Sequence, residues 1–82
     1  MNLEVAILNV LDTTPRPIPA DVIAAYVPQF LGQPAHADPD KAAALVLVAC
    51  QRMKLTDDVL GIPNRDHGIL WKLTANGKAR IA

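Results

Sequence analysis

Apolar residues recur at helical spacing in three segments before residue 55. The segments are residues 3–11, 20–27 and 39–54, and in each the apolar positions follow the three-and-four spacing that places them on one face of a helix. Asn2 stands directly before the first segment, where a residue that caps a helix N-terminus is expected. The pattern therefore predicts three helices.

Prolines mark the borders of the second and third helices. Pro28 interrupts the apolar spacing, so residues 29–31 are predicted to be either a kinked continuation of the second helix or a separate turn that ends at Gly32. Asp38 and Pro39 are expected to be the cap and the first residue of the third helix.

The first and third helices carry apolar residues on two sides. In the first helix, Val5 and Leu8 lie opposite the main apolar arc, so they are either covered within the domain or shared with another subunit. In the third helix, the spacing divides the residues into two arcs. The predicted buried arc is Ala42, Ala43, Leu45, Val46, Ala49, Cys50 and Met53, and the predicted outer arc is Asp40, Lys41, Ala44, Leu47, Val48, Gln51, Arg52 and Lys54.

A β-hairpin is predicted after the third helix. Two β-favouring runs, residues 59–60 and 69–73, flank the turn-rich residues 61–68, so the pattern indicates two strands joined by a long polar tip. A hairpin alone is marginally stable in water and needs a surface to pack against. The alternating prolines of residues 15–19 force an extended segment, in which Ile18 is the one apolar residue.

A short last helix is predicted over residues 75–81. Thr74 can cap its N-terminus, and Gly77 weakens it by about 1 kcal/mol relative to alanine. The stability of this helix is therefore expected to come from docking of Ile81 on the core.

Composition fits one small domain that spans residues 1–82. Hydrophobic residues make up 51% of the 82 residues, and the single cysteine, Cys50, is expected to be a buried thiol. The longest apolar run is too short for a membrane span, and the chain does not start with the basic segment of a signal peptide. A cytoplasmic protein without membrane contact is expected.

Charge is balanced overall but unevenly distributed. Eight basic and eight acidic residues give a net charge of zero, whereas nucleic-acid-binding domains usually carry a basic excess. Residues 41–82, however, contain seven of the eight lysines and arginines, and only Asp57, Asp58 and Asp66 of the acids. The C-terminal half is therefore basic.

The order of helix, extended segment, two helices and hairpin predicts an α+β fold, and it resembles the winged helix-turn-helix domains of bacterial and phage regulators. Residues 71–78, WKLTANGK, are similar to the aromatic-x-Leu-Thr-x-x-Gly-Lys/Arg ending of such domains. In such domains a short strand at the place of residues 15–19, here with Ile18 as its apolar residue, can pair with the hairpin. The resemblance implies a third helix in the major groove of double-stranded DNA and a hairpin tip on the adjacent backbone or minor groove. The DNA-binding residues that it implies are Lys41, Gln51, Arg52, Lys54, Asn64, Arg65, His67 and Lys72.

A second interpretation starts from the apolar outer arc of the third helix. Base-reading helices present hydrogen-bonding side chains, whereas Ala44, Leu47 and Val48 occupy this arc. Exposed apolar surface usually marks an interface, so the domain is alternatively a protein-interaction module that uses Leu47 and Val48, or Val5 and Leu8 of the first helix. Both interpretations are compatible with a homodimer.

The sequence contains no constellation of residues that indicates catalysis. His36 and His67 lack a cysteine or carboxylate at metal-binding spacing, and the four glycines are too scattered to form a phosphate-binding loop. The adjacent Asp57 and Asp58 are interpreted as the solvated end of a strand. We therefore expect neither enzyme activity, nor a metal, nor a cofactor.

Overall fold

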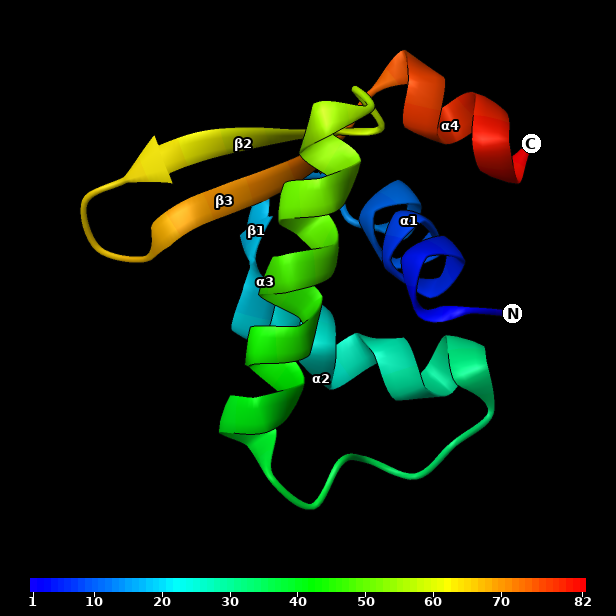
Figure 1. Cartoon of the computed structure of the whole chain (residues 1–82), viewed down its shortest axis with the longest axis vertical. Coiled ribbons are helices and arrows are strands. Elements are labelled where there is room, and N and C mark those ends of the chain that lie inside the picture. Colours follow the sequence, from blue (N-terminus) through cyan, green and yellow to red (C-terminus); the bar gives the residue numbers. More distant parts are fainter.

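The computed structural model, which describes residues 1–82, is an α+β structure in which helices pack against one face of a three-stranded sheet (Figure 1). None of the helices combines the length and hydrophobicity that crossing a membrane requires. The elements, in order, are α1 (Leu3–Thr13), β1 (Ile18–Pro19), α2 (Ala20–Leu31), α3 (Pro39–Leu55), β2 (Val59–Asn64), β3 (Gly68–Leu73) and α4 (Ala75–Ile81).

The predicted helix caps are present. The Asn2 side chain accepts a hydrogen bond from the Val5 N–H at 2.9 Å, which satisfies a backbone donor at the start of α1. At α3, Asp38 Oδ1 accepts from the N–H groups of Asp40 at 3.1 Å and Lys41 at 3.2 Å. These caps explain why both helices begin where the sequence places them.

Helix α2 continues through Pro28 to Leu31, which decides between the two predicted alternatives in favour of a single helix. The helix ends at Gly32, and the N–H of Gln33 returns to the Pro28 carbonyl at 3.0 Å. The connection from α2 to α3 is therefore residues 32–38.

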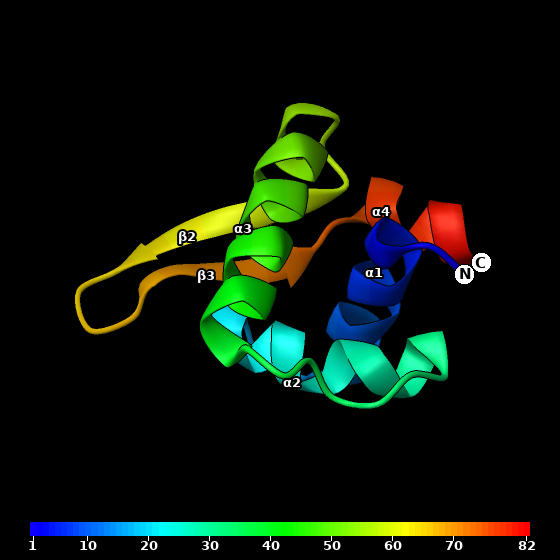
Figure 2. The same ribbon diagram turned by 60° about the horizontal axis from the view of Figure 1, so that its bottom comes forward.

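The sheet has the strand order β1-β3-β2, and both pairings are antiparallel. Ile18 of β1 lies opposite Trp71 of β3, which confirms that the proline-rich segment pairs with the hairpin. The β2–β3 hairpin projects away from the helices, as Figures 1 and 2 show from two directions.

The predicted long hairpin tip is wrong. Strand β2 extends to Asn64, so only residues 65–67 form the tip. Gly61 lies in the strand, opposite Trp71. The indole ring of Trp71 lies against it, and a Cβ atom at this position would approach Trp71 Cζ3 to 3.1 Å. The tip is closed by the Asn64 side chain, which accepts hydrogen bonds from the N–H groups of Asp66 at 2.9 Å and His67 at 3.0 Å.

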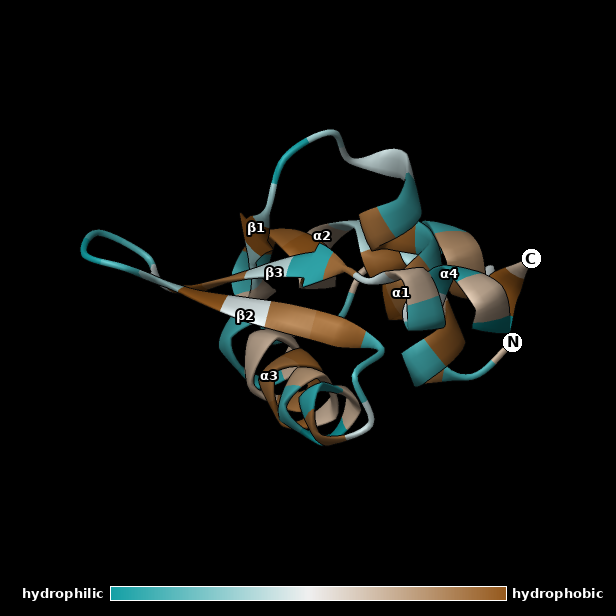
Figure 3. Ribbon diagram, turned by 90° about the horizontal axis from the view of Figure 1, so that it is seen from above, coloured by the Kyte–Doolittle hydropathy of each residue, from teal (hydrophilic) through white to brown (hydrophobic).

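A single apolar core joins the helices to one face of the sheet. In Figure 3 the hydrophobic segments gather where these elements meet, while the hairpin tip is hydrophilic. Trp71 is fully buried at this junction, as expected for the only tryptophan of a small domain. The buried apolar residues are Ala6, Ile7, Leu8, Val10, Leu11, Ile23, Val27, Val46, Ala49, Cys50, Met53, Val59 and Trp71.

The burial of Leu8 decides between the two alternatives stated for it, whereas the predicted position of Leu45 is wrong. Leu8 is fully buried because α1 packs against α2, α3, α4 and β3, so it is covered within the domain and does not belong to an interface. Leu45, predicted to be buried, is 50% exposed, because it lines open hollows between α3 and the neighbouring elements α1 and α2.

Asp58 is not a solvated strand end, because it is only 5% exposed. Its Oδ2 atom accepts hydrogen bonds from Thr56 Oγ1 at 2.7 Å and from Arg80 Nη1 of α4 at 2.5 Å. Burial of the carboxyl alone would raise its pKa, but the two hydrogen bonds and the Arg80 charge outweigh burial and lower the pKa below its usual value. Asp58 thus remains ionised and ties α4 to the rest of the domain.

Candidate nucleic-acid interface

Most cationic side chains of the chain have no acidic partner. Among the eight lysines and arginines, only two form ion pairs: Lys78 with Asp12, and Arg80 with Asp58 and, at 3.9 Å, with Glu4. Both belong to α4, so the acids that they neutralise lie near this helix. The six remaining cations are Arg16, Lys41, Arg52, Lys54, Arg65 and Lys72.

The hairpin tip presents two of the predicted DNA-binding side chains to solvent. Arg65 and His67 are exposed, and neither side chain makes a hydrogen bond or an ion pair, including between Arg65 and Asp66. Asn64, by contrast, uses its side-chain oxygen to build the turn. Asn64 therefore positions Arg65 and His67, and only its amide nitrogen is left for another partner.

Helix α3 divides its predicted DNA-binding residues between two flanks, because α1 and the hairpin lie on opposite sides of it (Figure 1). Leu47, Gln51 and Lys54 recur at i, i+4 and i+7, which places them on the flank toward the hairpin. The flank toward α1 carries Lys41, Leu45, Val48 and Arg52 at i, i+4, i+7 and i+11. Gln51 and Lys54 thus lie away from α1, whereas Arg52 lines a hollow with Glu4 of α1.

The predicted protein interface is divided in the same way. Leu47 is half-buried and packs against the core from the hairpin side, whereas Val48 is 54% exposed on the α1 flank. Val5 is half-buried, and its neighbour in that arc, Leu8, is in the core. The exposed apolar pair on α3 is therefore Leu45 and Val48, because the helix is rotated relative to the predicted arcs.

Lys72 is not brought together with the α3 cations. It is exposed on β3 and follows the buried Trp71, so it points away from the face of the sheet that packs on the helices. Lys72 also borders a hollow of about 240 Å³ between β3 and the end of α1, which it shares with Arg16 in the segment before β1. The sequence analysis did not single out Arg16, although the predicted pairing of Ile18 with the hairpin could have indicated that Arg16 lies beside the strand bearing Lys72.

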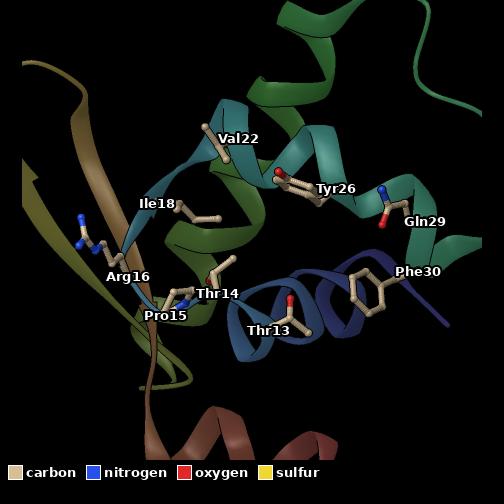
Figure 4. A pocket seen from close by; sticks show the side chains of 9 residues that line it. All are labelled: Thr13, Thr14, Pro15, Arg16, Ile18, Val22, Tyr26, Gln29 and Phe30. Atoms are coloured by element: carbon tan, nitrogen blue, oxygen red, sulfur yellow. The ribbon is translucent and has the colours of Figure 1, made fainter.

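A hollow of about 620 Å³ lies between residues 13–18 and α2 and contains no catalytic grouping. Figure 4 shows Val22, Tyr26 and Phe30 along one side of it, and the guanidinium of Arg16 pointing away toward the sheet. No three histidine, cysteine or acidic side chains lie close enough together to hold a metal ion.

No protein-family model matches this chain, and neither a curated protein nor a solved structure is significantly similar to it.

Proposed function

We propose that the chain is a small winged-helix protein that binds double-stranded DNA and acts as a transcriptional or phage-type regulator. The element order supports this, with a three-helix core followed by a projecting hairpin that serves as the wing. The observation that carries the proposal is the pattern of ion pairs. They neutralise the two cations of α4 and leave those of α3 and the hairpin tip without acidic partners.

The DNA would lie along the hairpin flank of α3 and against the hairpin tip. Gln51 is the one side chain of this flank that combines a donor and an acceptor, which suits it to a base edge. Lys54 and Arg65 would contact phosphates, and His67 would reach the neighbouring backbone. Because one amide offers little base readout, most of the affinity would come from phosphate contacts and would depend strongly on salt.

The test is binding of the protein to a fluorescent random-sequence duplex at about 50 mM and 200 mM salt. Micromolar binding that weakens with salt is expected. Lys54→Gln and Arg65→Gln should each weaken binding several-fold and reduce the slope of log K against log salt by about 0.9, because each removes one phosphate contact.

Arg16→Gln is the matched control. Arg16 is exposed and free of ion pairs like Arg65, but it lies before β1 and borders a hollow with Lys72 and the end of α1, away from the hairpin tip, so its removal should leave the affinity unchanged. Absence of binding at low salt, or binding that salt does not weaken, would refute DNA binding. Equal losses for Arg16→Gln and Arg65→Gln would refute the placement of the DNA.

A further inference from the structure

An apolar groove lies between α1 and α3, on the side of α3 that faces away from the hairpin. Its walls include Leu3 from α1 and Leu45 and Val48 from α3, and its volume is about 410 Å³. Leu45 and Val48 are 50% and 54% exposed, which is unusual for two large aliphatic side chains one helical turn apart. We call this surface the α1–α3 groove.

The groove continues beyond Leu45 into a second hollow, of about 250 Å³, formed by α3, the end of α2 and the loop that follows it. Leu3 and Leu45 line both hollows, so the apolar surface is continuous along α3. A continuous apolar surface of this kind on a domain with a small core indicates an interface.

Each wall of the groove also carries one charge, and the two charges have opposite signs. Glu4 is on the α1 wall and has Arg80 as its only ion-pair partner, at 3.9 Å. Arg52 is on the α3 wall and makes no ion pair. One wall therefore offers an aliphatic side chain beside a carboxylate, and the other offers aliphatic side chains beside a guanidinium.

We propose that the α1–α3 groove binds the same groove of a second copy of this chain, which makes a two-fold symmetric dimer. A two-fold axis along the groove places the α1 wall of one copy on the α3 wall of the other. Leu3 then packs between Leu45 and Val48 of the second copy, and Glu4 pairs with Arg52 of the second copy. The two-fold axis repeats each of these contacts, so the dimer contains two of each. Each wall complements the other in polarity and charge, which is what a self-association surface requires.

The contact leaves the hairpin flank of α3 uncovered, so the dimer does not depend on DNA binding. Seven residues line this groove, fewer than the roughly 20–30 residues that each partner contributes to a standard interface, so the dimer is expected to form in the micromolar range. The first measurement is the mass of the wild-type protein by sedimentation equilibrium across a concentration series. It should rise from one chain to two.

Charge reversal separates contact between copies from an effect within one chain. Glu4→Arg and Arg52→Glu should each raise the dimer Kd by at least about tenfold, because each creates two like-charge contacts across the axis. An equimolar mixture of the two variants should dimerise like the wild type, because every contact in the mixed dimer is again between opposite charges. Arg16→Glu, an equal charge change outside the groove, should leave the Kd unchanged.

Val48→Glu provides a test that does not involve Glu4 or Arg80. The side chain is half-exposed, so the variant should keep its circular dichroism spectrum and melting temperature but remain a monomer. Three results would each overturn the proposal: a wild-type protein that stays monomeric at millimolar concentration, a folded Val48→Glu variant that dimerises normally, or a mixture of charge variants that stays monomeric.

Discussion

Gly77 is unfavourable for an isolated helix but is required in the folded chain. Helix propensity alone treats it as a defect of α4 that costs about 1 kcal/mol relative to alanine. In the structure it is buried, and a Cβ atom at this position would overlap the Asp58 carbonyl oxygen and come within 2.7 Å of Leu73 Cδ1. Glycine is what allows α4 to approach the start of β2 so closely.

Gly77→Ala should therefore destabilise the protein by about 2–3 kcal/mol, because the backbone must shift to relieve the overlap. The free energy of unfolding from a urea titration measures this. Asn76→Ala, at the exposed neighbouring position, is the control and should be neutral or slightly stabilising. A stabilised Gly77→Ala variant would mean that propensity outweighs the close approach.

At the scale of elements, α4 depends on charges that lie far away in the sequence. Arg80 reaches the buried Asp58 before β2, and Lys78 pairs with Asp12 at the end of α1. The backbone adds a hydrogen bond from the Thr74 N–H to the Asp58 carbonyl at 3.2 Å. A helix of seven residues is too short to be stable alone, so these contacts hold it in place.

The Asp58 contact predicts a loss of stability in acid. Because the folded protein holds the pKa of Asp58 below its unfolded value of about 3.9, the ionised carboxylate stabilises the fold above that value, and the contribution is lost as the pH falls through the folded pKa. Asp58→Asn should cost about 2 kcal/mol at pH 7 and flatten the acid dependence of the unfolding free energy.

Asp57→Asn serves as the control for this prediction. Asp57 is exposed, and its φ of 61° is a conformation that asparagine tolerates as well as aspartate. The unfolding free energy of the Asp57→Asn variant should follow the wild-type dependence on pH. If the Asp58→Asn variant keeps the full acid dependence, the loss of stability in acid arises from other carboxylates.

Local signals predicted most of the elements, and long-range contacts account for the errors. The Asn2 and Asp38 caps depend on residues close in sequence, and the hairpin depends on simple alternation. The pairing of Ile18 with Trp71 is a long-range contact that was expected only from the resemblance to winged-helix domains. The burial of Asp58 depends on Arg80, twenty-two residues later, which no periodicity reveals. The exposure of Leu45 depends on how the start of α1 is placed beside α3. Helical spacing alone therefore could not show which apolar residues of α3 are exposed.

The basic half of the chain was recognised from the sequence, but its division between surfaces was not. Spacing alone put Gln51, Arg52 and Lys54 on one outer arc, whereas α1 and the hairpin separate Arg52 from the other two. Lys72 was likewise placed among the DNA-binding residues, although it follows the buried Trp71 and strand alternation turns it to the opposite face of the sheet.

At the scale of the whole molecule, Cys50 reports on the opening of the core. It is fully buried, and desolvation by burial raises its pKa to about 12. Its reaction with a thiol reagent near pH 8 should be at least about a thousandfold slower in the native protein than in denaturant, because only opened molecules can react. Ala79→Cys in a Cys50→Ala background, with the thiol at an exposed position, should react without this delay. Rapid native labelling of Cys50 would show that the core opens locally.

The two proposed surfaces lie on opposite flanks of α3, and this arrangement gives each a separate role. The proposed DNA contact would use the flank toward the hairpin, and the proposed contact between copies would use the flank toward α1. In a two-fold dimer each copy would keep its hairpin flank available, as required for a protein that binds two half-sites.

The prolines at the borders of the sheet have a consequence for behaviour at high concentration. Both outer strands carry proline, at Pro19 in β1 and Pro63 in β2, and Pro17 directly precedes β1. A proline offers no N–H to an incoming strand, so each border disfavours the addition of strands from further chains. Growth of the sheet into amyloid-like fibrils is therefore disfavoured at high concentration, which leaves the helices as the surface for the proposed pairing of two copies.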